Sequence, residues 1–88
     1  MDKKIRLAAV KERTPRLIEA LTAVWEHSAR ATHHFLSEPE LLRIRAYIPQ
    51  AVGGVAQLVA AENQAGEPVG FMGVENGRLE MLFLAPEA

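Results

Sequence analysis

The positions of apolar residues along the chain predict a strand, two helices and three further strands. The short apolar run Ile5–Val10 follows two lysines and is typical of a strand. Thr14 and Pro15 then mark a helix start, because threonine is a favoured N-cap and proline a favoured first helical residue. The residues after them recur at helical spacing and predict an amphipathic helix with one buried stripe: Leu17, Ile18, Leu21, Val24, Trp25 and Ser28.

A second helix is predicted from about Glu38 to Ile48. Ser37 and Glu40 form a capping-box pattern, in which each side chain accepts a hydrogen bond from the backbone amide of the other residue. Pro49 and the pair Gly53-Gly54 are expected to stop this helix. The residues that the helix would bury share one face: Leu41, Ile44 and Ile48.

Three strands joined by short turns complete the pattern. Val55–Glu62 and Val69–Val74 are rich in β-compatible residues, and NQAGEP makes the turn between them. Asn76-Gly77 predicts a tight hairpin into the last strand, Arg78–Leu84. Neighbours joined by short turns must be antiparallel. The predicted fold class is therefore α+β, with the order β-α-α-β-β-β and a mainly antiparallel sheet that has two helices on one face.

The last strand, within LEMLFLA, is apolar on both faces. Strict alternation places Leu79, Met81 and Phe83 on one face and Leu82 and Leu84 on the other. Strands of this kind belong to sheets that are covered on both faces. Two helices cover one face only, so the other must be covered by something else or stay exposed. This pattern predicts a homodimer that buries the face against a second copy.

Composition bounds the partners and the compartment. The 88 residues allow one small domain, residues 1–88, and the hydrophobic content of 49% is ordinary for a globular protein. A net charge of −1 argues against nucleic acid or an anionic membrane as partner. The absence of cysteine excludes disulfides, thiolate zinc sites and thiol nucleophiles, and fits a reducing cytoplasm. The apolar run near the N-terminus is too short for a signal peptide or a membrane span, so a cytoplasmic location is predicted.

Glu80 is the first candidate for chemistry. A carboxylate in the middle of an apolar strand is disfavoured unless it is satisfied or functional. Burial would raise its pKa and would suit it to act as a base near neutral pH. The alternative is that Glu80 faces solvent near a strand edge or pairs with Arg78.

His33 and His34 raise the question of a metal site. Adjacent histidines in a short loop are poorly placed to chelate one ion, and His27 lies six residues before His33, which does not put the two on one helix face. No metal site is therefore predicted.

Two segments carry a resemblance to a known family. The pattern S-x-R-A-T-H-x-F-L, within WEHSARATHHFLSEPEL, and the pattern G-F-x-G followed by L-F-L-x-P resemble the N-terminal half of the GNAT superfamily, the acetyl-CoA-dependent N-acetyltransferases. The chain is similar in particular to small, mostly uncharacterised bacterial acetyltransferases, over about Ile5–Ala88. The resemblance implies transfer of an acetyl group from acetyl-CoA, the cosubstrate, to a primary amine on a small molecule or a peptide.

The resemblance also implies roles for individual residues. Glu80 would be the catalytic base that deprotonates the acceptor amine, directly or through water. The backbone groups of Leu82, Phe83 and Leu84 would bind the coenzyme's pantetheine arm and polarise the thioester carbonyl beside a β-bulge. Core packing is the alternative for these three residues, and the two roles are compatible. The segment between the helices would bind the acceptor or, equally well, only pack and cap the second helix; its residues are Arg30, His33, His34 and Phe35.

The chain departs from the family after the last strand. There the family has an R/Q-x-x-G-x-G/A loop whose amides bind the coenzyme pyrophosphate at a helix start. The sequence stops at Ala88, where that loop would begin. The expectation is a partial acetyltransferase domain without the pyrophosphate loop and the C-terminal half. The alternative function is a non-catalytic, oligomerising interaction module or an inactive fragment.

Overall fold

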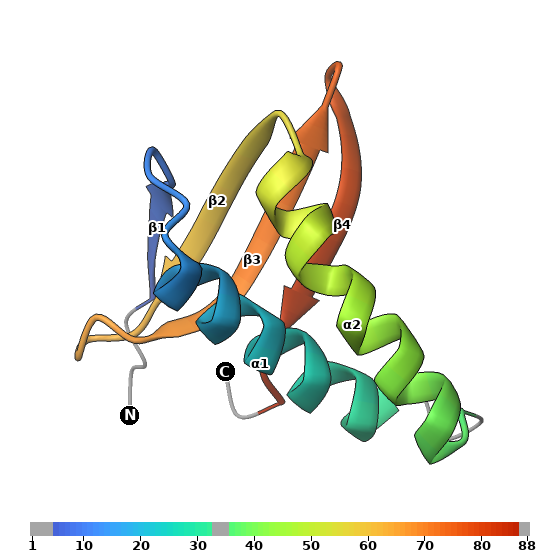
Figure 1. Ribbon diagram of the computed structural model, residues 1–88. Coiled ribbons are helices and arrows are strands. Elements are labelled where there is room, and N and C mark those ends of the chain that lie inside the picture. The colour runs from blue at the N-terminus through green and yellow to red at the C-terminus, as the bar shows by residue number, and fades with distance from the viewer. Residues whose placement is uncertain (1–4, 33–35, 87–88) are drawn as a thin grey trace.

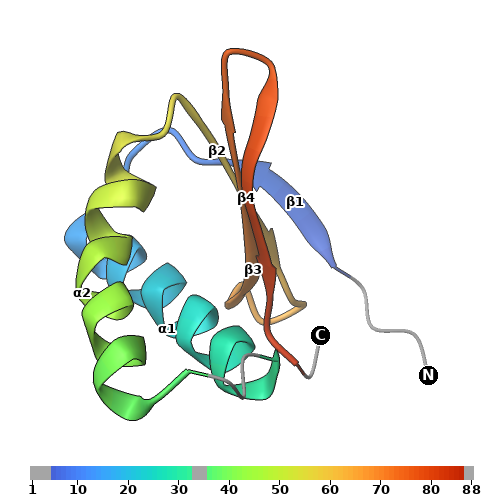
Figure 2. The same ribbon diagram turned by 90° about the vertical axis from the view of Figure 1, so that its right-hand side faces the viewer.

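The computed structural model describes residues 5–32 and 36–86, and it has the predicted element order. The strands form one antiparallel sheet with the order β1-β2-β3-β4 (Figure 1). Both helices lie on the same face of this sheet (Figure 2), which confirms the α+β prediction. The elements are β1 (Arg6–Ala9), α1 (Pro15–Thr32), α2 (Glu38–Gly54), β2 (Gln57–Glu62), β3 (Pro68–Glu75) and β4 (Arg78–Leu84).

Helix α1 is the central element of the core, because it contacts α2 on one side and β3 and β4 on the other. It begins as predicted: the Thr14 hydroxyl accepts a hydrogen bond from the backbone amide of Leu17, at 3.1 Å. The helix buries the stripe that holds Trp25, and β2 and β3 supply the opposite wall of the core. The buried cluster consists of Leu21, Val24, Trp25, Ala29, Leu41, Ile48, Val52, Val55, Leu58, Ala60 and Phe71.

Helix α2 begins at the predicted capping box but does not end where the sequence predicted. Ser37 and Glu40 exchange both hydrogen bonds, and the Ser37 amide holds the pKa of Glu40 below its usual value. The predicted stop at Pro49 is wrong, because the helix continues through this proline to Gly54. Val52 lies beyond the proline and is fully buried, so packing of the last turn outweighs the lost hydrogen bond.

The predicted buried face of α2 is also partly wrong. Ile44 is 39% exposed, whereas Leu41, Ile48 and Val52 are buried. Helix α2 packs mainly against α1, and a helix with one neighbour buries a narrow stripe rather than a broad face. Ile44 lies outside that stripe.

Arg13, which precedes α1, caps the C-terminal end of α2. Its guanidinium donates hydrogen bonds to the carbonyl oxygens of Val52, Gly53 and Ala56, each at 3.2 Å, and to that of Val55. The last carbonyls of a helix have no partner within the helix, and a cation there also interacts favourably with the helix dipole. Arg13 therefore holds the segment before α1 against the end of α2, across about 40 residues of sequence.

The β3–β4 hairpin turns at Asn76-Gly77 as predicted, with φ angles of 53° and 75°. Its ladder then shifts register: Val74 lies opposite Leu79 and Gly73 opposite Met81, which leaves Glu80 as the extra residue of a bulge. Leu79 therefore lies opposite Val74, on the other face from Met81 and Phe83, and is 56% exposed, so the prediction that these three side chains share one face is wrong for Leu79. The bulge explains the difference, because it interrupts the alternation on which that prediction depended.

The sheet face opposite the helices is apolar and open. Its exposed side chains include Leu7 of β1 (67% exposed), Leu82 (55%) and Leu84 (52%) of β4. Leu84 lies across Gly70, where a Cβ atom would overlap the leucine side chain and lie 3.0 Å from the Phe83 carbonyl oxygen. The register aligns two apolar rows across all strands: Leu7, Ala61, Gly70 and Leu84, and Ala9, Val59, Met72 and Leu82. Within residues 5–32 and 36–86, no element covers these rows (Figure 2).

Candidate functional site

The backbone groups of Leu82 and Leu84 point toward the free edge of the sheet. The Ala85 amide donates to the Val69 carbonyl at 2.7 Å, which makes these two residues a hydrogen-bonded pair. Bonded and non-bonded pairs alternate along an antiparallel ladder. Leu84 opposite Gly70 and Leu82 opposite Met72 are therefore non-bonded pairs. The N–H and C=O groups of both leucines are thus directed away from β3.

The position of β4 leaves these groups accessible. β4 is the last strand in the sheet, so its outer edge has no neighbouring strand among the described residues. Unpaired N–H and C=O groups on an edge strand can pair with an extended ligand or with another strand. The edge at Leu82 and Leu84 can therefore bind a molecule that offers a row of amide or carbonyl groups.

Phe83 has a different place from its two neighbours. It lies opposite Phe71 in a bonded pair of the ladder, and the two rings are 5.5 Å apart between centroids. Its side chain packs against the core cluster on the helix face. Phe83 thus contributes a side chain to the core, whereas the outward backbone groups come from Leu82 and Leu84.

Glu80 lies at the bulge of β4, two residues before Leu82. Its side chain is exposed, and it makes no hydrogen bond or ion pair with the part of the chain that the structure describes. Glu80 is therefore not buried in the apolar strand. Of the two alternatives to burial, pairing with Arg78 is not observed, whereas an exposed position on the edge strand is. Its carboxylate lies on the strand that presents the free amides, and its role as a base stays a prediction.

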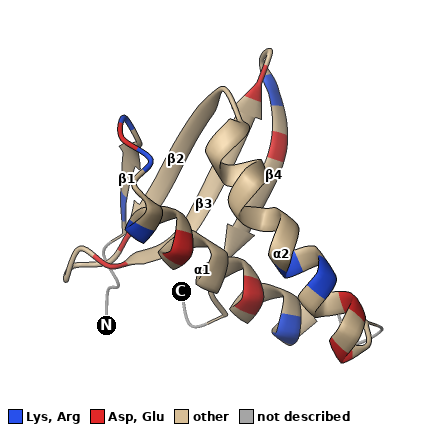
Figure 3. Ribbon diagram, in the orientation of Figure 1, with Lys and Arg blue, Asp and Glu red and all other residues tan. Residues whose placement is uncertain are grey.

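The α1–α2 junction is held by a network of ion pairs. Arg30, near the end of α1, donates two hydrogen bonds of 2.8 Å to Glu38 in the first turn of α2 and one of 2.9 Å to Glu26. Glu26 also accepts a 2.6 Å hydrogen bond from Nε of Arg45. Figure 3 shows basic and acidic positions of α1 and α2 close together toward one end of the helix pair. The network ties the last turns of α1 to α2 on both sides of the junction.

These contacts change the acidity of the two carboxylates. Arg45, and then Arg30, hold the pKa of Glu26 below its ordinary value, and Arg30 does the same for the pKa of Glu38. Glu38, and then Glu26, raise the pKa of Arg30 further above its already high value. The guanidinium of Arg30 therefore acts first as a link between helices, and contact with an acceptor stays a prediction for it.

The other predicted acceptor residues, His33, His34 and Phe35, lie outside the described residues. No group of three histidine, cysteine or acidic side chains that could hold a metal ion occurs within residues 5–32 and 36–86. None of the helices described is long and apolar enough to cross a membrane.

Sequence comparison finds similar proteins but no matching family model. The peptidyl-lysine N-acetyltransferase YjaB of Escherichia coli strain K12 is 38% identical over 74 residues, which cover 78% of this chain and 46% of that protein. The protein of the same name from Salmonella typhimurium strain LT2 is 33% identical over 69 residues, or 78% of this chain and 47% of the relative. The chain spans about half the length of the curated relatives it matches.

Structural comparison extends the similarity to almost the whole chain. The solution structure of the apo form of YjaB from Escherichia coli superposes with a TM-score of 0.75 and 29% sequence identity. The match covers 99% of this chain and 55% of that protein. In both sequence and fold, the chain therefore resembles the N-terminal half of a GNAT N-acetyltransferase, as its motifs indicated.

Proposed function

We propose that this chain forms the part of an N-acetyltransferase that binds acetyl-CoA, and that the acetyl group is transferred to a primary amine. The observation that carries the proposal is the free edge of β4, where the backbone groups of Leu82 and Leu84 point outward. Pantetheine is an extended chain with two amide groups, so it suits such an edge. The names of the YjaB relatives favour a lysine side chain of a peptide as the acceptor, rather than a small-molecule amine.

The proposed reaction begins with attack of the neutral amine on the thioester carbonyl carbon. An outward N–H of Leu82 or Leu84 donates to the carbonyl oxygen and stabilises the negative charge that develops there. The C–S bond then breaks, and coenzyme A leaves as the thiolate. Glu80, directly or through one water molecule, accepts the proton that the amine loses. The product is an amide, and no redox step is involved.

Acetyl-CoA titration with backbone amide NMR tests the proposal. We expect a dissociation constant of about 100 μM or tighter, equal to roughly −5.5 kcal/mol, with shifts centred on residues 82–84. The substitution Leu82→Pro removes one outward N–H without breaking a bond to β3, because proline is tolerated at such edge positions. It is expected to weaken binding at least about tenfold.

Leu82→Ala is the matched control, since it shortens the same side chain and keeps the backbone amide. We expect its affinity to stay within about threefold of that of the original chain. The proposal is refuted if millimolar acetyl-CoA causes no shifts in β4, or if the alanine and proline variants bind equally well.

The open apolar face supports a second function, that of an oligomerising interaction module without catalysis. We propose that the chain forms a homodimer through Leu7, Leu82 and Leu84, which are all more than half exposed. A stable interface buries roughly 1,200–2,000 Å² in total. The two apolar rows reach such an area only if they pack against a similar apolar face.

A cytoplasmic location also remains a prediction, based on the absence of cysteine.

Light scattering across a wide range of concentrations tests the homodimer. We expect twice the mass of one chain, and a return to the mass of one chain when Leu82→Glu places a charge in the interface. Glu12→Gln, at an exposed position outside this face, serves as the control and should leave the dimer intact. A single-chain mass at every concentration rules out this homodimer.

A further inference from the structure

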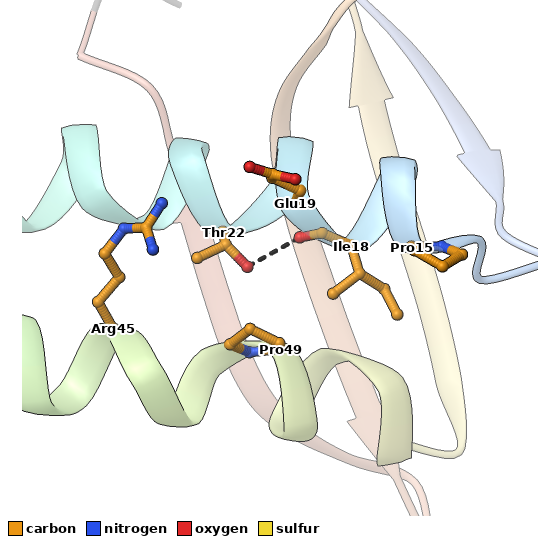
Figure 4. A pocket seen from close by; sticks show the side chains of 6 residues that line it. All are labelled: Pro15, Ile18, Glu19, Thr22, Arg45 and Pro49. Atoms are coloured by element: carbon orange, nitrogen blue, oxygen red, sulfur yellow. Dashed lines mark hydrogen bonds between the residues drawn. The ribbon is translucent and has the colours of Figure 1, made fainter.

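The paired helices contain a groove of about 370 Å³ that none of the predicted site residues lines. It lies between α1 and α2 on the surface that faces away from the sheet (Figure 4). Sites for small molecules commonly have volumes of about 300–1,000 Å³. Helix α1 supplies Pro15, Ile18, Glu19 and Thr22, and α2 supplies Arg45 and Pro49.

One part of the groove is apolar. Pro15 and Ile18 form it from α1, and the ring of Pro49 faces them from α2 (Figure 4). Thr22 contributes little polarity, because its hydroxyl donates a 2.8 Å hydrogen bond to the Ile18 carbonyl within its own helix. This part of the groove fits an aliphatic side chain.

The remaining wall of the groove carries one cation. Nε of Arg45 is occupied by Glu26, whereas its terminal N–H groups make no hydrogen bond with residues 5–32 or 36–86. In Figure 4 these terminal nitrogens lie on the side of Arg45 that faces Thr22. A guanidinium held through one nitrogen, with its outer N–H groups open, is well placed to bind a carboxylate.

The groove also carries one anion. Glu19 is exposed, and its carboxylate makes no hydrogen bond or ion pair within the described part of the chain. No ion pair joins it to Arg45 across the groove. The two helices therefore present one unpaired negative group and one partly free positive group beside an apolar surface.

We propose that this groove binds a small zwitterion of the α-amino-acid class that has an aliphatic side chain. Its carboxylate accepts from the terminal N–H groups of Arg45, and its ammonium group donates to Glu19. The side chain lies against Ile18 and Pro49. A purely cationic or purely anionic ligand could satisfy only one of the two charged groups and would be repelled by the other.

This site is separate from the proposed acetyl-CoA edge, because the groove is lined by residues of α1 and α2 alone and the strands lie behind the two helices in Figure 4. It does not depend on the proposed acetyl transfer. Arg45 also belongs to the ion-pair network through Glu26 and Arg30. A ligand bound at Arg45 therefore contacts one end of the network that holds the α1–α2 junction.

Amide NMR with L-leucine as the probe tests this inference. We expect saturable shifts at Ile18, Glu19, Thr22 and Arg45 at concentrations up to about 50 mM. N-acetyl-L-leucine lacks the ammonium group and L-leucinamide lacks the carboxylate. Each is expected to bind at least about tenfold more weakly than leucine, because each loses one charged hydrogen-bonding partner.

Substitutions in the groove give a second readout. Glu19→Gln and Arg45→Gln are expected to weaken leucine binding at least about fivefold. Glu12→Gln and Arg43→Gln change exposed charges outside the groove and should alter leucine binding by less than about twofold. The proposal is overturned if leucine causes no saturable shifts, or if leucine and both blocked analogues bind equally well. Both of these readouts use the unsubstituted chain, so they hold even if Arg45→Gln loosens the helix pair.

Discussion

Replacing Arg13 with alanine is expected to lower the free energy of unfolding by about 2 kcal/mol. The guanidinium donates to four carbonyl groups at the end of α2 and just beyond it, and two of these bonds are partly buried. Alanine leaves those carbonyls without a protein donor and removes the favourable charge at the helix end. Water can replace part of the loss, since the site is only partly enclosed, so the effect is smaller than a sum over four charged hydrogen bonds.

Urea unfolding followed by circular dichroism measures this effect. Arg16→Ala is the matched control, because Arg16 is exposed and makes no side-chain hydrogen bond within the described residues. Arg13→Lys should recover only part of the stability, since one ammonium group cannot reproduce the planar fork of donors. Equal stability of the Arg13→Ala and Arg16→Ala variants would show that the contacts of Arg13 contribute nothing to folding.

Replacing Pro49 with alanine is expected to have the opposite effect and to raise the free energy of unfolding by about 2 kcal/mol. Proline inside a helix costs about 3 kcal/mol relative to alanine, because it lacks the N–H that would bond to the carbonyl four residues earlier. Part of this gain, about 1 kcal/mol, is offset because proline also stiffens the unfolded chain. Pro49 is exposed, so alanine loses little buried surface.

Pro39→Ala provides the control within the same helix. Pro39 lies in the first turn of α2, where a missing N–H has no intrahelical partner to lose. This substitution should therefore leave stability unchanged or lower it slightly. If Pro49→Ala does not stabilise the chain relative to Pro39→Ala, the ring of Pro49 contributes packing that its exposed position does not suggest. The same variant should weaken leucine binding, since the ring lines the groove.

The order and type of the elements could be predicted from the sequence because their signals are local. Thr14-Pro15, the Ser37/Glu40 box and Asn76-Gly77 each specify a start or a turn through bonds within a few residues, and all three are observed. The apolar character of both faces of β4 was also readable from the sequence. It predicted the open face that Leu82 and Leu84 now display.

The errors arose where distant parts of the chain compete with local preference. Pro49 favours a helix end, but burial of Val52 beyond it continues the helix. Ile44 has the spacing of a buried residue, but α2 packs mainly against α1 and leaves Ile44 exposed. The bulge at Glu80 depends on pairing with β3, and strict alternation along β4 cannot reveal it.

The candidate site was predictable only in part. The family resemblance predicted that the backbone of residues 82–84 binds the coenzyme. The outward direction of the Leu82 and Leu84 backbone follows only from their register with β3. Arg45 and Glu19 carried no sequence signal, because they lie 26 positions apart on separate helices. Arg13 was likewise missed, since its partners are about 40 residues away.

By itself, the sequence determined the helices, strands and turns, the lack of cysteine chemistry and the resemblance to an acetyltransferase half. These depend on short-range patterns of polarity, capping and turn residues, which act before the chain is compact. Only the tertiary structure decided which charges meet, where the groove lies, and which backbone groups of β4 remain free. Those features depend on the packing of α2 against α1 and on the register of β4 with β3, which local patterns do not contain.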